Sequence, residues 1–240
     1  MPTSTSSTPG TSATSEATGA GPGPIAAPSV VGTALRPTET ATRRRMIDAA
    51  VECIMEKGFY RASTNEIART AGVSWGVIQH HFRTREGLML AVLRDGAEKF
   101  FEHMRTARVE GETAERRLEH LTAILTAHYG DPTYLAYLQV ELNLDHDPAT
   151  SAEVRTTMRE VAERSHGHVR RLLREALGEA ASVPELATTV FLALRGFAIS
   201  QQLQGAMAYD MAPRAVRLAR QRALLAQLLA PYVEQVAGGR

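Results

Sequence analysis

Apolar residues recur every three or four positions along most of the chain after about residue 36. This spacing predicts amphipathic helices, because residues three or four apart share one face of a helix. No run of alternating β-branched residues is long enough to suggest a sheet. The pattern therefore predicts an all-α protein.

The first predicted helix begins near Thr40 and ends at Gly58, a residue type that favours helix C-termini. Its apolar side is predicted to contain Ile47, Ala50, Ile54 and Met55. Ser63 and Glu66 then fit a capping box, in which Ser63 caps a short second helix and the Glu66 side chain reaches back to the Ser63 N–H.

A turn at Ala71-Gly72-Val73 separates this short helix from a third, which Ser74 can cap and which runs to His81. Two short helices joined by such a turn match the helix-turn-helix pattern, whose second helix enters the major groove of DNA. Ile78 and Phe82 share the face that must point to the core, which turns Gly76 and His80 outward.

An exposed glycine inside a short helix costs about 1 kcal/mol relative to alanine. Close approach of the backbone of Gly76 to DNA would explain its presence. Residues 36–94 also contain ten Arg or Lys against six Asp or Glu. This excess is a modest bias toward a polyanion, although a solvated basic face would produce it equally well.

Longer helical patterns follow Thr84, which can cap a fourth helix. Proline disfavours a continuing helix before it, so joints are predicted at four proline-containing stretches. They are Asp131-Pro132, Asp145 to Pro148, Gly178 to Pro184 and Ala212-Pro213. The last two segments, 184–208 and 213–236, are the most apolar, which suits ordinary core and an intersubunit four-helix bundle equally well.

Residues 1–35 are almost entirely Ser, Thr, Ala, Gly and Pro, with too little apolar area to offset the entropy of ordering. We therefore expect a disordered low-complexity tail, a domain at 36–94 and a second at 95–240. The tail lacks the basic start and apolar run of a secretory signal, and no later stretch is apolar enough for a membrane span. Cys53 is the only cysteine, which excludes a disulfide framework and fits a cytoplasmic protein.

The run from Arg44 to Leu93 resembles the DNA-binding domain of TetR-family transcriptional regulators. Such domains have a first helix ending in Gly-Phe/Tyr, a short helix with Ile-Ala, an Ala-Gly-Val-Ser turn, a Gly-Thr-Leu-Tyr-Tyr-His-Phe helix and a Lys-Glu-x-Leu start. The corresponding elements here are Gly58-Phe59-Tyr60, Ile67-Ala68, Ala71-Gly72-Val73-Ser74, Gly76-Val77-Ile78-Gln79-His80-His81-Phe82 and Arg85-Glu86-Gly87-Leu88.

The resemblance implies three kinds of DNA contact. Thr64 and its neighbours at the N-terminus of the second helix would hold a backbone phosphate, and Trp75-Gly76-Val77 would lie nearest to base edges. Arg43-Arg44-Arg45 would add phosphate or minor-groove contacts. Further phosphates would be positioned by Gln79, His81 and Arg85. The predicted DNA-binding residues are Arg43, Arg44, Arg45, Ser63, Thr64, Ser74, Trp75, Gly76, Val77, Gln79, His80, His81 and Arg85.

Three of these positions depart from the family pattern. Val77 replaces a Thr, which removes a hydroxyl and allows an apolar contact with a thymine methyl. Gln79 replaces a Tyr and could either donate to a phosphate or read an adenine. Arg85 replaces a Lys with a planar, fork-shaped cation. Trp75 leaves two orientations open: the helical pattern directs it toward the core, whereas the family position directs it to the groove.

The histidines do not form a helical metal site, because His80 and His81 point about 100° apart and ligands on one helix need a spacing of three or four. Asp145-His146-Asp147 is ordinary turn chemistry before a proline. The motifs of serine hydrolases, P-loop and dinucleotide-binding enzymes and H-E-x-x-H metalloproteases are missing from the sequence. We therefore expect no enzyme, no metal and no cofactor.

A ligand site is expected between Gly111 and Met211, the region that resembles the family least. Arg195 lies in an apolar helix and must pair, extend to solvent, or meet a ligand or partner. Tyr134, Tyr137 and Glu141 share one helix face that suits either a pocket or the rim of a bundle. The candidate ligand-binding residues are Tyr134, Tyr137, Glu141, Arg195 and Gln201.

The resemblance implies an N-terminal three-helix DNA-binding domain with a helix-turn-helix and a C-terminal helical bundle for ligand binding and dimerisation. The expected protein is a homodimer through the last two helices that represses transcription and leaves a palindromic double-stranded DNA operator when a small-molecule effector binds. The alternative is a helical ligand-binding or scaffold dimer without specific DNA binding.

Overall fold

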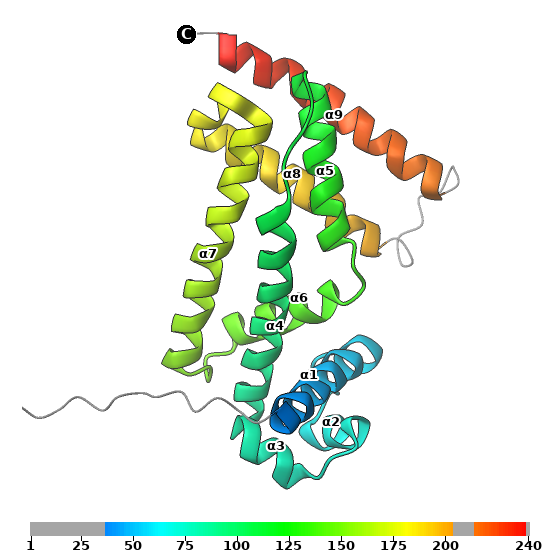
Figure 1. Ribbon diagram of the computed structural model, residues 1–240, viewed down its shortest axis with the longest axis vertical. Helices are drawn as coiled ribbons and strands as arrows, with labels where there is room; N and C mark the ends of the chain where they lie inside the picture. The colour runs from blue at the N-terminus through cyan, green and yellow to red at the C-terminus, as the bar shows by residue number, and fades with distance from the viewer. Residues whose placement is uncertain (1–36, 204–213, 239–240) are drawn as a thin grey trace, which may run out of the picture. The chain divides into compact units, whose positions relative to one another are not determined.

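The computed structural model describes residues 37–203 and 214–238, and both ranges are helical with no strand. The all-α prediction is therefore confirmed over this part of the chain. The predicted tail at 1–35, the joint at Ala212-Pro213 and residues 204–208 lie outside the described residues. The elements are α1 Pro37–Lys57, α2 Thr64–Ala71, α3 Trp75–Phe82, α4 Arg85–Thr106, α5 Ala114–Tyr129, α6 Tyr134–His146, α7 Ala152–Leu177, the 3-10 helix η1 Gly178–Ser182, α8 Pro184–Leu203 and α9 Arg214–Gly238 (Figure 1).

The predicted stops at Gly58 and Gly72 and the caps by Ser63 and Thr84 are confirmed, whereas the predicted cap by the Ser74 side chain is wrong, because that side chain makes no capping hydrogen bond. Gly58 and Gly72 have φ values of 82° and 64°, a left-handed backbone that glycine adopts without strain. Ser63 Oγ accepts the Glu66 N–H at 3.3 Å, and Thr84 Oγ1 accepts the Gly87 N–H at 3.0 Å. These bonds satisfy N–H groups that the helix itself leaves without partners.

Two further local predictions are wrong. The Glu66 side chain does not reach the Ser63 N–H, which donates to the Arg61 carbonyl at 2.8 Å. The Glu66 carboxylate instead pairs with Lys57 and Arg69, whose full positive charges attract it more strongly than a neutral N–H group does. Met55 is 44% exposed and does not lie on the apolar side of α1. It points about 100° away from Ile54, which is fully buried.

A first hydrophobic core joins the three N-terminal helices to the beginning of α4. Its fully buried side chains include Met46, Ile54, Ile67, Ile78 and Leu88. Residues of α6 and the start of α7 complete this core, namely Ala136, Tyr137, Val140, Leu144 and Val154. The N-terminal helices are thus packed directly on helices of the second predicted domain.

A second core lies between α5, α7, α8, α9 and the second half of α4. Helix α4 runs through both cores without a break, so the predicted boundary between residues 94 and 95 falls inside it (Figure 1). The joints predicted at Asp131-Pro132, Asp145 to Pro148 and Gly178 to Pro184 each separate two helices. None of the helices in the described ranges is long and apolar enough to span a membrane.

Candidate nucleic-acid interface and ligand cavity

Helix α3 has one buried and one exposed side, as its sequence predicts. Ile78 and Phe82 are buried in the first core, whereas Gly76, Gln79 and His80 are exposed. The buried pair fixes the rotation of the helix, so the exposed residues form a face that is available to a groove of DNA.

The structure shows how the side chains of two residues at the start of α3 are exposed. Trp75 is 43% exposed, so its ring lies on the outer side of the domain rather than in the core. Val77 is half-buried and packs against the first core, so only part of this side chain is left to meet a base. Trp75 is accordingly better placed than Val77 for a contact outside the protein.

Gly76 has no packing role within the described residues. A Cβ added there would have Ser74 Oγ, 3.8 Å away, as its nearest neighbour outside the helix backbone. Ser74 precedes α3 in the extended conformation of a cap, but its side chain makes no capping hydrogen bond. The backbone at the start of α3 is therefore open on its outer side.

The cations predicted to bind phosphate differ in their freedom. Arg44 pairs with Asp48 on its own helix and with Asp95 on α4, and the hydrogen bonds that it donates to Asp48 are the largest cause of its raised pKa. Arg85 donates to the Phe59 carbonyl at 2.8 Å. Both side chains therefore hold the domain together, in addition to any role toward DNA.

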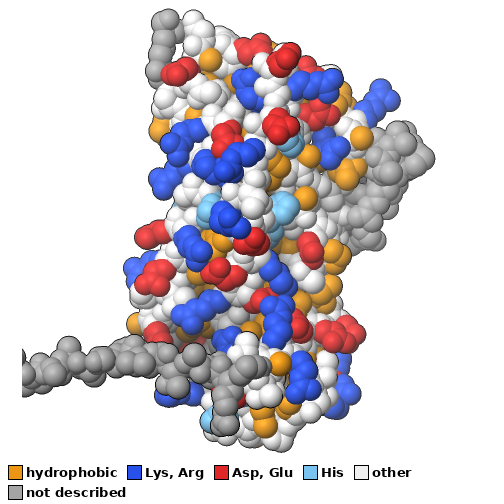
Figure 2. All heavy atoms as spheres, viewed as in Figure 1, with side chains coloured by type: hydrophobic (Ala, Val, Ile, Leu, Met, Phe, Trp, Pro, Cys, Tyr) orange, Lys and Arg blue, Asp and Glu red, His pale blue; other side chains and the backbone are white. Residues whose placement is uncertain are grey.

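The remaining basic residues predicted to bind DNA differ in their exposure. Arg45 is exposed, and its contact with Thr42 is long, at 3.5 Å. The Arg43 guanidinium lies 5.1 Å from the centre of the Phe82 ring and is half-buried. His81 is also half-buried, and burial lowers its pKa. On the face drawn in Figure 2, Lys and Arg side chains are interspersed with Asp and Glu rather than gathered into one basic patch.

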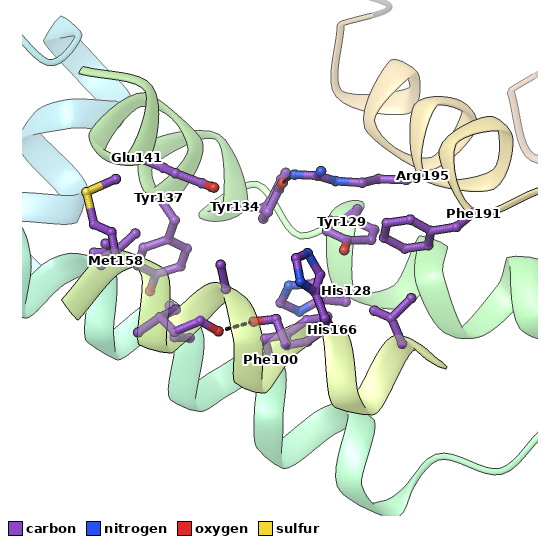
Figure 3. Close-up of a pocket in the computed structure, with 17 residues that line it drawn as sticks. Phe100, His128, Tyr129, Tyr134, Tyr137, Glu141, Met158, His166, Phe191 and Arg195 are labelled. Atoms are coloured by element: carbon purple, nitrogen blue, oxygen red, sulfur yellow. Dashed lines mark hydrogen bonds between the residues drawn. The ribbon is translucent and has the colours of Figure 1, made fainter. Parts of the chain in front are cut away.

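A cavity of about 170 Å³ lies between α4, α5, α6, α7 and α8 (Figure 3). Four of the predicted ligand residues line it together: Tyr134, Tyr137, Glu141 and Arg195. Gln201 does not line it, because it stands six residues after Arg195 and so points about 120° away around α8. Its amide lies 3.4 Å from the Phe197 carbonyl instead.

Arg195 extends across the cavity from α8 toward α6 (Figure 3). Its Nη2 donates to the Tyr134 hydroxyl at 3.0 Å, and its guanidinium lies 5.4 Å from the centre of the Tyr129 ring. Burial opposes the charge of Arg195, but Tyr134 and Tyr129 favour it, and its pKa is raised overall. The cavity therefore contains a permanent positive charge.

His128 and Phe100 form an aromatic wall beside this charge, with their ring centres 4.9 Å apart. Burial, followed by the charge of His103, lowers the pKa of His128 to about 4. The imidazole is therefore neutral near pH 7 and acts as part of the aromatic surface.

Helix α6 links the cavity to the DNA-binding domain through two side chains. The Tyr137 hydroxyl, at the cavity, donates to Asp95 Oδ2 at 3.0 Å, and Asp95 in turn pairs with Arg44 of α1. Gln139, two residues along α6, accepts the Phe59 N–H through Oε1 at 3.1 Å. A displacement of α6 by a ligand would thus be transmitted to α1 and to the segment after it.

Comparison with known proteins identifies the N-terminal domain. Residues 46–92 match the family model described as "Bacterial regulatory proteins, tetR family". Over these residues the chain matches the TetR family. It is 40% identical over 83 residues to the HTH-type transcriptional regulator BetI of Escherichia coli O127:H6, a stretch that covers 34% of this chain and only 43% of that relative.

Solved structures are similar to this chain over a longer range. The regulator FadR of Bacillus subtilis, in complex with stearoyl-CoA, has 21% sequence identity and a TM-score of 0.56, covering 78% of this chain and 97% of its own. The multidrug binding protein EbrR, complexed with imidazole, has 24% identity and a TM-score of 0.53, covering 79% and 94%. At these identities the likeness shows the fold alone.

Sequence reasoning missed most of the cavity wall. The missed side chains are those of Leu93, Gly96, Ala97, Phe100, His128, Tyr129, Met158, Val161, Ala162, Ser165, His166, Val169 and Phe191. The spacing of these residues on α4, α5, α7 and α8 is typical of ordinary core positions. No local feature of the sequence predicts which faces of these helices pack against one another. Within the described ranges, no group of three or more His, Cys, Asp or Glu side chains is placed to hold a metal ion.

Proposed function

We propose that this chain is a transcriptional repressor that binds a palindromic operator and is released from it by a small molecule. The observation that carries the proposal is the exposed face of α3, with a glycine that no described protein contact requires. Such a face allows the helix backbone to approach base edges closely. The match to a family of bacterial regulatory proteins supports the same role.

A palindromic operator requires two DNA-binding domains, one for each half-site. The last two helices offer a surface on which a second copy of the chain can pack. Leu192 on α8 and Leu224, Leu228 and Tyr232 on α9 are all at least half exposed. Large apolar side chains exposed together are costly in water and favour association. A homodimer through α8 and α9 accounts for them.

The cavity supports the response to a ligand. Two proteins of similar fold are described in complex with small molecules, stearoyl-CoA and imidazole. In this chain the hydrogen bonds from Tyr137 to Asp95 and from Phe59 to Gln139 supply a physical connection between the cavity and the DNA-binding domain. A ligand changes operator affinity only if it binds the two states of the dimer with different affinity.

The test is a gel shift of the purified full chain with the DNA upstream of its own coding sequence, repeated at several salt concentrations. A repressor retains a preference for one sequence over a scrambled duplex, while its affinity falls steeply with salt because counterions are released. Equal affinity for all duplexes at every salt concentration would overturn the proposal. That result would favour a helical ligand-binding or scaffold dimer without specific DNA binding.

A further inference from the structure

The positive charge of Arg195 has no ion-pair partner within the described residues. No carboxylate oxygen of that part of the chain lies within 4.0 Å of its guanidinium, and its buried Nε–H has no hydrogen-bond acceptor. Leaving a buried donor of a charged group unsatisfied is costly, so such sites normally gain a partner. The surroundings of Arg195 thus have the chemistry of an empty anion site.

Tyr134 adds a second donor to this position. Its hydroxyl oxygen accepts from Arg195 Nη2, and its own proton has no acceptor in the described part of the chain. An anion beside Arg195 would therefore receive a charge-assisted bond from the guanidinium and another from the Tyr134 O–H. By contrast, the hydroxyl of Tyr137 is already engaged by Lys99 and Asp95.

The rest of the cavity fits a flat ring. Phe100, Tyr129, Phe191 and the neutral His128 contribute aromatic surface (Figure 3). Its volume of about 170 Å³ resembles that of an apolar protein cavity of about 150 Å³ that binds benzene. A single six-membered ring with a short substituent matches this space, whereas a long chain exceeds it.

Glu141 opposes an anion, although weakly. It lines the cavity, but its carboxylate is exposed to solvent and makes no ion pair with Arg195. Exposed charges are screened by water, so the buried guanidinium has the larger influence on a ligand inside the cavity.

We propose that the cavity binds a one-ring aromatic carboxylate, whose carboxylate pairs with Arg195 and Tyr134 while its ring packs among Phe100, His128 and Phe191. This inference rests on the proposed ligand response and specifies its chemical class. It assigns Arg195 as the residue that selects anions over neutral or cationic compounds of the same shape.

The test is calorimetric titration of the purified full chain, without DNA, with benzoate, phenylacetate, benzyl alcohol and benzylammonium. At least one of the two carboxylates is expected to bind saturably, and more tightly than benzyl alcohol and benzylammonium. Arg195→Met should weaken it by about 10- to 100-fold, the usual effect of losing a charge-assisted bond. Glu141→Gln should strengthen it, and Arg170→Met, at an exposed arginine on α7, should leave it unchanged.

Three results would overturn the proposal: tighter binding of benzylammonium, undiminished carboxylate binding by Arg195→Met, or no saturable binding of either carboxylate. If Arg195→Met does not fold, Arg195→Lys is used in its place. It keeps the positive charge but lacks the planar guanidinium, so the loss of carboxylate affinity should be smaller. Glu141→Gln tests the sign of the charge preference without altering Arg195. A gel shift on the same samples separates the two proposals, since operator binding without carboxylate binding contradicts only the ligand class.

Discussion

The Tyr137 hydroxyl, at the ligand cavity, donates to Asp95 Oδ2 at 3.0 Å, and the same carboxylate pairs with Arg44 of the DNA-binding domain. Tyr137→Phe removes this bond and should lower the free energy of unfolding by about 1–3 kcal/mol, as expected for a hydrogen bond to a charged group. Urea denaturation measures the change. Tyr60→Phe, at a side chain that is 86% exposed, is the matched control and should have almost no effect.

The same pair allows a test of the connection itself. A double-mutant cycle of Tyr137→Phe and Arg44→Ala should give a coupling of at least about 0.5 kcal/mol, because both side chains bind one carboxylate. Simple additivity of the two losses would contradict a connection through Asp95.

Gly96 is required by the packing of α4 on α6. A Cβ at this position would lie 2.6 Å from Tyr137 Cγ, so Gly96→Ala should destabilise the fold by about 1–3 kcal/mol. Gly167→Ala is the contrasting substitution, since nothing lies within 4 Å of its Cβ position on α7. It should stabilise the fold by about 0.5–1 kcal/mol, and urea unfolding of both variants would show opposite signs.

Gly76→Ala should separate stability from DNA binding. The new methyl group meets no described atom closer than Ser74 Oγ, so stability should stay constant or rise by up to about 1 kcal/mol. Operator affinity should fall by about tenfold or more, equivalent to ~1.4 kcal/mol, because the methyl group holds the helix away from the groove. Unchanged operator affinity in a gel shift would show that α3 does not approach DNA at Gly76.

Gln79 and Arg85 should differ in how they affect DNA recognition. Gln79 is exposed, so Gln79→Ala should change the order of preference among operator variants. Arg85→Ala should weaken binding to all variants alike and also destabilise the domain by about 1–2 kcal/mol, since Arg85 donates to the Phe59 carbonyl. Parallel gel shifts and thermal unfolding measure both effects, and equal losses across all operators for both variants would contradict the assignment.

His128 should make the fold sensitive to acid. Its pKa is about 4 in the folded protein against 6.5 for an ordinary histidine, so the unfolded chain binds a proton first as the pH falls. Stability is therefore lost between about pH 6.5 and pH 4, by up to ~3 kcal/mol. His128→Gln should lose less stability than the wild type over this window, and His80→Gln, at an exposed site, should follow the wild type.

Local chemistry allowed much of this fold to be predicted from the sequence. Ser63 and Thr84 cap helices through their own side chains, and Gly58 and Gly72 end helices through their own backbone freedom. Each of these features acts within a few residues of the chain. The spacing of Ile78 and Phe82 likewise predicts which face of α3 is buried. The helix-turn-helix was accordingly predictable in both position and orientation.

The contacts that the sequence did not predict join residues that are distant from one another along the chain. The capping-box role of Glu66 is a local expectation, whereas Lys57, its partner, lies nine residues earlier on another helix. Arg85 bonds to Phe59, 26 residues away. The cavity is the extreme case, because periodicity shows that one helix has an apolar face but does not show which faces meet.

The division of the cavity wall between helices bears on how a new sensor would be engineered or evolve. Tyr137 is connected to the DNA-binding domain through its hydrogen bond to Asp95. Gln139 on the same helix is connected to that domain through its hydrogen bond with Phe59. Substitutions of cavity-lining residues on α6 that change ligand preference therefore also disturb operator affinity. Val161 and Ala162 of α7 line the same space outside both connections, which makes them the positions where ligand preference can diverge while the operator response is kept.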